Sequence, residues 1–263
     1  MKSLKKILAV VLALSLLFCF AGCGEEEEKK LIIATNAEFE PFESLDSDNN
    51  PVGFDIDLMN AIGKKLGYKI QFENMEFDGV VAAVNSGSCD AAISGLTINA
   101  KRKKSVNFSD AYYSGAAQIL IVAADDTHYT GTTKKDLDKQ LENQAIGVCS
   151  GYTGHSYAKG DKEWGFEGIK GADIKIYENV SLAIADIKNG TINAIIMDDS
   201  VAKEAVSQNS EDVKAIDVPL TVEEYGIAVS KNNDELLKEI NKALKDLEDD
   251  GTVEKLLKKY ELD

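Results

Sequence analysis

Histidine, cysteine and arginine are scarce in this sequence of 263 residues, and the scarcity excludes some kinds of site. There are two histidines and four cysteines. Cys19 and Cys23 belong to the N-terminal segment, which leaves Cys89 and Cys149 for the folded part of the chain. Those two cysteines are not spaced like metal ligands, and there are only two histidines, so we do not expect a zinc site. The sequence therefore predicts no metal site and no cofactor.

Basic residues are also outnumbered. The chain has 29 Lys and Arg against 45 Asp and Glu, a formal net charge of −16. Residues 1–22 contain three lysines and no acid, so without them 26 basic residues face 45 acidic ones, a net charge of −19. Such a surface repels nucleic acids and anionic lipids. The charge therefore excludes a polyanionic partner, but it does not select a small ligand.

The long apolar run of a membrane span is missing as well. Ile7 to Phe20 is apolar but shorter than the roughly 20 residues that a membrane-spanning helix needs. Three lysines precede it, which is typical of a signal peptide. The following Phe20-Ala21-Gly22-Cys23 resembles a bacterial lipobox, in which Cys23 is acylated after cleavage, although Phe20 stands where Leu is usual. An ordinary signal peptide or an uncleaved anchor is the alternative.

These features predict where the protein is located. We expect residues 1–22 to be a signal peptide and residues 23–30 to be a lipidated cysteine with a charged, flexible tether. A lipid on Cys23 would hold the protein at the outer face of the cell membrane. The predicted localisation is therefore extracytoplasmic and lipid-anchored.

The single arginine, Arg102, lies in the stretch from Asp90 to Tyr113. The apolar run Ala91-Ala92-Ile93 predicts a short buried strand, which a Ser94-Gly95 turn and a short helix with Arg102 follow. A helix N-terminus presents free N–H groups, and the Thr97 hydroxyl and the guanidinium add further donors. We interpret this as a carboxylate-sized anion site. The alternative is a solvated basic face, which we prefer only for the flanking lysines, because Lys does not replace a forked donor.

The same stretch resembles a family signature. Its pattern D-A-A-I-S-G-L-T-I-N-x-x-R-K-K-S-V-N-F-S-D-x-Y-Y is similar to that of polar amino-acid-binding proteins of ABC transporters. These are extracytoplasmic solute-binding proteins with two lobes. The resemblance extends, less densely, over almost everything after residue 30, and it implies that Arg102 pairs with the α-carboxylate of a bound amino acid.

The order of the predicted elements agrees with this fold class. Strands alternate with helices after residue 30, which predicts α/β lobes with mostly parallel sheets. The resemblance implies a two-lobed, periplasmic-binding-protein-like (type II) fold with two chain crossovers. Residues 31–111 and 221–263 would form lobe 1, residues 112–116 the first crossing, and residues 117–220 lobe 2. We expect hinge closure around one amino acid.

A loop at the carboxyl end of the strand Leu31 to Thr35 starts the predicted site. Ligands of open α/β sheets bind at this edge, and Asn36 and Phe39 are placed there. The resemblance implies that Phe39 and Phe77 form two aromatic walls that sandwich a ligand side chain and exclude water. The alternative for Phe39 is a role in the core.

Acids accompany the starts of two predicted helices in lobe 1. Asp55 and Asp57 lie in the first turn of the helix after Gly53, and Asp78 precedes the helix that ends near Gly87. Carboxylates accept hydrogen bonds from the free N–H groups of a first turn. We therefore interpret all three acids as helix caps.

Lobe 2 offers a second Gly-rich turn, Ser150 to Gly154, after the predicted strand Ala145 to Cys149. The family often has G-T-T-G at this point, and here Tyr152 replaces the first Thr. Thr153 can still offer its N–H group and hydroxyl to a carboxylate. A Gly-rich turn is weak evidence by itself, and the shared context is what supports the role of Thr153.

Asp198 ends the predicted strand that starts at Asn193. The resemblance implies that an acid at this position binds the α-ammonium group, together with a carbonyl of Ser94 or Gly95. Asp198 and Arg102 on opposite sides of the site would together pair with both charges of a zwitterion. The alternative is that Asp198 caps the following helix.

The identity of the ligand side chain is less well determined. Asn36 stands where family members that read basic or amide side chains often carry Asp, and Cys149 and Met197 stand where the glutamine-binding type is polar. These departures disfavour glutamine, and more weakly arginine or lysine. They favour an uncharged polar or sulfur-containing side chain, although Glu38 and Glu40 could still reach a cation.

Two other classes of function stay open at this point. Cyclohexadienyl dehydratases resemble this fold, but an enzyme needs an acid/base group in the cleft, and only His155 lies near a predicted pocket loop. Ligand-sensing domains are joined to signalling modules, whereas this chain stops at Asp263 without a transmembrane helix or kinase after the domain. We therefore expect a monomeric, non-enzymatic binding protein whose partners are a free amino acid, a membrane permease and, through its lipid, the membrane.

Overall fold

The computed structural model describes residues 29–263. The predicted signal peptide, residues 1–22, and the predicted lipidation site, Cys23, lie outside these residues. Of the predicted tether, residues 23–30, the last two belong to the described part, and strand β1 already begins at Lys30. Within residues 29–263, no helix combines the length and the apolar composition that crossing a membrane requires.

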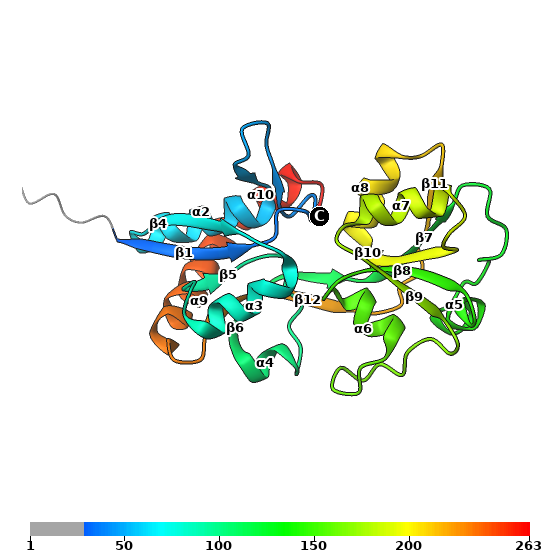
Figure 1. Cartoon of the computed structure of the whole chain (residues 1–263). Coiled ribbons are helices and arrows are strands. Elements are labelled where there is room, and N and C mark those ends of the chain that lie inside the picture. The colour runs from blue at the N-terminus through cyan, green and yellow to red at the C-terminus, as the bar shows by residue number, and fades with distance from the viewer. Residues whose placement is uncertain (1–28) are drawn as a thin grey trace, which may run out of the picture.

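The described residues form two α/β lobes, as the sequence predicts (Figure 1). Each lobe is built around a five-stranded sheet. In lobe 1 the strand order is β4-β1-β5-β12-β6, with bounds Lys69–Asn74, Lys30–Thr35, Ala91–Ala92, Glu223–Ser230 and Val106–Ala116. In lobe 2 the order is β11-β7-β10-β8-β9, with bounds Val213–Ile216, Gln118–Ala123, Ala194–Asp198, Ala145–Cys149 and Asp173–Tyr177. A small hairpin of β2 (Ser44–Leu45) and β3 (Pro51–Val52) extends lobe 1.

The two sheets are mixed, whereas the sequence predicts mostly parallel ones. In lobe 1, β1 pairs in parallel with β4 and β5, but β12 pairs antiparallel with β5 and β6. In lobe 2, β8 pairs in parallel with β9 and β10, but β7 pairs antiparallel with β10 and β11. The reason is that the chain enters each lobe at the cleft. Strands β7 and β12 therefore start at the cleft and run away from it, whereas their antiparallel neighbours run toward it.

Helices cover both faces of each sheet (Figure 1). In lobe 1, α2 (Phe54–Leu66), α9 (Asp234–Asp249) and α10 (Thr252–Lys259) pack together on one face, and α3 (Phe77–Ser86) and α4 (Arg102–Ser105) lie on the other. In lobe 2, α7 (Val180–Lys188) and α8 (Asp199–Gln208) share one face, and α5 (Lys134–Leu141) and α6 (Thr153–Lys159) lie on the other.

Helix α2 illustrates how the sequence dictates this packing. Phe54, Leu58 and Ile62 recur every four residues and are fully buried, so they form one apolar face against the sheet. The helix ends at Gly67, which adopts the left-handed conformation (φ 75°) that a residue without Cβ adopts most readily. Burial of such a face is the main source of helix stability in a protein.

The chain passes twice between the lobes. Strand β6 ends at Ala116, and β7 begins at Gln118 in the other sheet. The return path runs from the end of β11 at Ile216 to the start of β12 at Glu223. The carboxyl ends of β1 and β5 therefore face those of β8 and β10 across the cleft, and the loops after these four strands form the contact between the lobes.

Candidate functional site

A small cavity lies where the loops of the two lobes meet. Its volume is about 10 Å³, which is roughly the space that one water molecule needs. The residues that line it are Phe39, Phe77, Gly95, Thr97, Arg102, Tyr152, Thr153 and Asp198. The sequence predicts every one of these as a ligand contact except Tyr152. The other predicted contacts, Asn36, Ser94 and Cys149, are buried but do not line this cavity.

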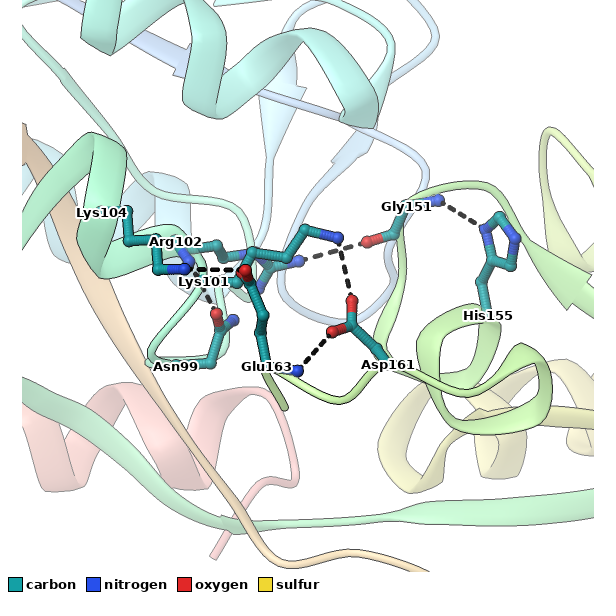
Figure 2. Close-up of polar contacts among 8 residues, drawn as sticks. All are labelled: Asn99, Lys101, Arg102, Lys104, Gly151, His155, Asp161 and Glu163. Atoms are coloured by element: carbon teal, nitrogen blue, oxygen red, sulfur yellow. Dashed lines mark hydrogen bonds and ion pairs between the residues drawn. The ribbon is translucent and has the colours of Figure 1, made fainter. Parts of the chain in front are cut away.

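Arg102 spans the gap between the lobes. Its Nη1 donates to the Thr97 carbonyl (3.1 Å) in its own lobe. Its Nη2 donates to the Gly151 carbonyl (3.3 Å) in the other lobe, as Figure 2 shows. The guanidinium carbon lies 5.2 Å from the ring centre of Phe77 and 5.4 Å from that of Trp164, which is within cation–π distance. Burial lowers the guanidinium pKa to about 10, so Arg102 is still charged at neutral pH.

The helix that carries Arg102 does not act as predicted. Helix α4 begins at Arg102 itself, and the Arg102 N–H donates to the Asn99 side chain (2.7 Å), while the Lys103 N–H donates to the Asn99 carbonyl (3.0 Å). The expectation that free N–H groups of this helix contribute to an anion site is therefore wrong, because Asn99 occupies them. The anion-binding capacity of this segment comes from the Arg102 side chain and the Thr97 hydroxyl.

Thr97 and Thr153 meet across the interface, and a third side chain joins them. Their hydroxyl oxygens are 3.1 Å apart, and each lies 2.7 Å from the same carboxylate oxygen of Glu223. Glu223 starts β12 and also accepts from Gln118 (3.1 Å) and Thr221 (2.6 Å). The sequence pattern does not single out Glu223; its one signal is the position at which the chain re-enters lobe 1. The hydroxyls predicted to hold a ligand carboxylate thus already hold a carboxylate of the chain.

Asp198 lies on the opposite side of the cavity. It is 3% exposed, and its Oδ1 accepts from the Tyr225 hydroxyl (2.8 Å) of lobe 1. It occupies the N-cap position of α8, but its side chain makes no capping bond there. Burial raises the pKa of Asp198 to about 8, and the charge of Glu223 adds to the effect. A cation bound next to Asp198 would therefore favour loss of its proton.

Tyr152 fills the space beside the two predicted aromatic walls. Its ring centre is 4.5 Å from that of Phe77 and 5.5 Å from that of Phe39, and its hydroxyl donates to Asn36 Oδ1 (3.1 Å). The Asn36 amide nitrogen donates to the Met75 carbonyl (3.0 Å). The only sequence signal for this arrangement is the departure from the usual Thr. As a result, Asn36 is engaged by the chain's own groups rather than facing an open pocket.

Cys149 lies next to this aromatic group. Its sulfur is 4.0 Å from the Met197 sulfur, and both residues are about 1% exposed. Burial raises the pKa of the Cys149 thiol to about 12, so the thiol is protonated and unreactive at neutral pH. This pair provides an apolar, polarizable floor behind the cavity.

The turn after β5 is held by two buried acids. The Ser94 hydroxyl donates to Glu43 (2.7 Å) and accepts from the Asn36 N–H (3.0 Å), and the Gly95 N–H donates to Asp55 (2.8 Å). Gly95 has a φ of +50°, and a Cβ there would lie 2.4 Å from the Phe39 ring, so only glycine fits. The expectation that Asp55 caps a helix is wrong, since its carboxylate binds this turn and the Tyr112 hydroxyl instead.

The two other acids interpreted as caps also bind elsewhere. Asp57 accepts from Lys259 (2.6 Å) and Tyr260 (2.8 Å), and so joins α2 to α10. Asp78 accepts from the Ser150 hydroxyl (2.6 Å) of the other lobe, and the N-cap position of α3 belongs to Glu76. In each case a partner distant in the sequence replaces the local helix N–H groups that the pattern suggests.

Glu43 and Asp55 lie together and form a carboxyl pair. Both are 0% exposed, and Glu43 Oε2 and Asp55 Oδ1 have no hydrogen-bond partner among residues 29–263. Burial raises both pKa values, that of Asp55 to about 6. Two adjacent buried carboxyls cannot both ionise cheaply, so one proton shared between these oxygens satisfies both.

Glu43→Gln tests this shared proton. A glutamine amide donates to Asp55 permanently, so we expect the variant to remain folded and to lose part of its pH dependence. The pKa of Asp55 in the folded protein lies above its ordinary value of 3.8, so the stability it contributes is complete below that value and is lost as the pH rises through about 6. Thermal unfolding from pH 4 to pH 8 should therefore show a smaller decline for Glu43→Gln than for the natural chain.

Glu43→Ala should behave oppositely, because it leaves the Ser94 hydroxyl and Asp55 unpaired. We expect a loss of about 2–4 kcal/mol in the free energy of unfolding. Glu40→Ala is the matched control, since Glu40 lies on the same loop but is exposed, and it should change stability little. Equal pH profiles for Glu43→Gln and the natural chain would contradict the shared proton.

Ion pairs bridge the lobes at the rim, beside Arg102 (Figure 2). Lys101 pairs with Asp161 (2.9 Å), and Lys104 pairs with Glu163 (2.8 Å). The two lysines fit the predicted solvated basic face, since both side chains are more than half exposed, and each also pairs with an acid of lobe 2. Exposed pairs of this kind contribute at most about 1 kcal/mol each.

His155, the residue considered for acid/base chemistry, lies beside Gly151 of the Gly-rich turn (Figure 2). Its Nδ1 accepts from the Gly151 N–H (3.4 Å), and it does not belong to the lining of the small cavity. Burial lowers its pKa, which favours the neutral ring. In this position His155 supports the turn and does not face Arg102 and Asp198 across the cavity.

Comparison with known proteins shows the family of this chain. Residues 31–263 match the model of the bacterial extracellular solute-binding proteins, family 3. A probable histidine-binding protein of Neisseria gonorrhoeae is 34% identical and covers 98% of this chain and 96% of its own. The arginine-binding extracellular protein ArtP of Bacillus subtilis is 34% identical, with 98% of both chains covered.

The fold comparison gives the same result. The crystal structure of the substrate binding protein of an amino acid ABC transporter superposes with a TM-score of 0.76 at 34% identity, over 88% of this chain and 98% of that one. The family match spans nearly all described residues, and the sequence relatives exceed 30% identity over almost the whole chain. The chain therefore belongs to the bacterial extracellular solute-binding proteins, family 3.

Proposed function

We propose that this protein captures a free amino acid between its lobes and delivers it, chemically unchanged, to the permease of an ABC transporter. The two sequence relatives are named as histidine- and arginine-binding proteins, and the solved structure is named as the substrate binding protein of an amino acid ABC transporter. The observation that supports it most is that the Arg102 guanidinium and the Asp198 carboxyl group line one small cavity, where a bound ammonium group would favour the ionised form of Asp198. A zwitterion satisfies both charges at once, and each is costly to leave unpaired in a closed site.

We further propose that the ligand side chain is cationic. Glu38 lies beside Phe39 on the loop after β1, and its pKa is raised by partial burial and by the charges of Glu76 and Glu178. A cation bound there would offset this repulsion. Asn36, which favours an uncharged side chain in the sequence, bonds to Met75 and Tyr152 instead. The histidine- and arginine-binding relatives support the same class of ligand.

We also propose that the lobes move about a hinge, that the protein is attached to the membrane by a lipid, and that it acts as a monomer. Lobe 2 (residues 117–220) would rotate against lobe 1 (residues 31–111 and 221–263) through residues 112–116. The lipobox-like segment at Cys23 supports attachment to the outer face of the membrane. Both halves of the site come from one chain, which supports action as a monomer.

A thermal-unfolding screen against the free amino acids tests this function. At a concentration of about 100 times Kd, a ligand that binds only the folded state should raise the melting temperature by about 5–10 °C. We expect the shift for arginine, histidine or lysine, and little shift for glutamate, glutamine or methionine. A shift for glutamine or methionine alone would preserve amino-acid capture and overturn the cationic class. No shift for any amino acid, after unfolding and refolding to remove a co-purified ligand, would overturn the function itself.

A further inference from the structure

Tyr152 holds a defined position at the head of helix α6. The preceding Gly151 has a φ of +73°, and a Cβ there would lie 2.1 Å from Asp78, so the turn has little freedom. Tyr152 follows in an extended conformation (φ −73°, ψ 165°), and the Ser156 N–H donates to its carbonyl. This backbone directs the Tyr152 side chain out of lobe 2 and toward the loops of lobe 1.

The side chain is packed there as a core residue would be. It is 4% exposed, its ring contacts Phe77 and Phe39 of lobe 1, and its hydroxyl donates to Asn36 of the same lobe. A ring of lobe 2 thus occupies the place beside the two aromatic walls of lobe 1. The cavity that remains beside Arg102 and Asp198 is about 10 Å³, far too small for an amino acid.

We propose that Tyr152 is a built-in competitor for the ligand side chain and sets the specificity of the site; this inference rests on the proposed function. A bound amino acid has to displace the ring from Phe39 and Phe77 before the lobes can close on it. The adjoining cavity of about 500 Å³, which Phe77, Gly151 and Trp164 help to line, offers space for the displaced ring. Ligand binding therefore replaces the contact of the Tyr152 ring with Phe39 and Phe77 by a contact of the ligand side chain with the same two rings.

This exchange selects a chemical class of ligand. A side chain that replaces Tyr152 must regain the contacts that the ring gives up. A planar cation, such as guanidinium or imidazolium, can stack on Phe39 and Phe77 and gain cation–π attraction as well. A small side chain, such as that of alanine or serine, leaves the walls uncovered. The site should therefore take arginine or histidine and reject small amino acids, with lysine between them.

Tyr152→Thr and Tyr152→Phe test the competition. Binding of arginine, histidine, lysine, alanine and serine should be measured by calorimetry for both variants and the natural chain. We expect Tyr152→Thr to bind arginine or histidine at least about tenfold more tightly, and to bring alanine or serine into the measurable range. Tyr152→Phe keeps the ring and loses only the bond to Asn36, so its affinity should rise only a fewfold. Weaker or unchanged binding in Tyr152→Thr would overturn the proposal, because the ring would then be a ligand contact or inert.

A second readout needs no ligand and separates this inference from the proposed function. If Tyr152 joins the lobes, ligand-free Tyr152→Thr should have a larger radius of gyration in X-ray scattering than the ligand-free natural chain, while Tyr152→Phe should stay compact. Equal radii for all three would overturn the competition. If the radii differ as expected and no amino acid binds any variant, the proposed function fails while the role of Tyr152 in closure stands.

Discussion

Arg102→Ala should weaken amino-acid binding by roughly a hundredfold to a thousandfold. Removal of one partner of a buried, hydrogen-bonded charge pair costs about 2–5 kcal/mol, and 1.4 kcal/mol corresponds to a factor of ten. The ligand carboxylate would lose its forked donor, because Arg102 is the only arginine in the chain. Calorimetric titration of the natural chain and of the variant measures this ratio directly.

Arg102→Lys and Lys103→Ala complete this experiment. Lysine keeps the charge but cannot donate to the carbonyls of Thr97 and Gly151 together, nor stack as a plane between Phe77 and Trp164. We expect it to recover only a minor part of the lost affinity. Lys103 is the exposed neighbour on α4, and its removal should leave affinity unchanged. A loss of less than about tenfold in Arg102→Ala would show that the carboxylate is bound elsewhere.

Asp198→Asn should cost about a hundredfold in affinity and also remove a pH effect. The asparagine oxygen can still accept from Tyr225, so the change removes mainly the charge opposite the ligand ammonium. In the natural chain the pKa of Asp198 is raised to about 8. Below that value the carboxyl holds a proton that must leave before the ammonium can pair with it.

The sign of the pH effect follows from this proton. Affinity should rise with pH, by up to about tenfold per unit below pH 8, and level off above it. In Asp198→Asn the slope should vanish, because the amide does not titrate. Asp199→Asn is the matched control: the neighbouring acid binds the Ala117 N–H and Lys203 outside the cavity, and its loss should keep both the affinity and the slope. A natural chain with a flat profile between pH 6 and pH 8 would contradict the role of Asp198.

The sequence could predict those residues that belong to a local pattern or to the stretch that resembles the family signature. Arg102 follows an apolar strand and a Ser-Gly turn, which predicts an anion site, and Asp198 ends a predicted strand at a position where the family resemblance implies an ammonium site. The sequence could also predict the two lobes, because strands and helices alternate along the whole folded part. It could not predict the direction of β7 and β12, since that depends on which end of a sheet the chain re-enters.

The residues that escaped prediction have partners that are distant in the sequence. Glu223 binds Thr97, 126 positions away, and Glu43 binds Ser94, 51 positions away. An acid in a loop is usually exposed, and no local pattern indicates that the fold will bury it. For Asp55 a local pattern exists and misleads, because the Gly95 N–H, 40 positions away, replaces the helix N–H groups as its partner. Tyr152 escaped for the same reason, since its ring packs on the other lobe.

Trp164 should make the separation of the two lobes measurable by fluorescence. It is the only tryptophan in the chain, and its ring belongs to lobe 2 but lies 5.4 Å from the Arg102 guanidinium of lobe 1. When the lobes separate, the indole leaves this cation and enters water, and its emission should shift to longer wavelength. The intrinsic fluorescence of the protein therefore reports the gap between its lobes without any dye. Rapid mixing with an amino acid would follow the time course of capture through the emission wavelength of this single tryptophan.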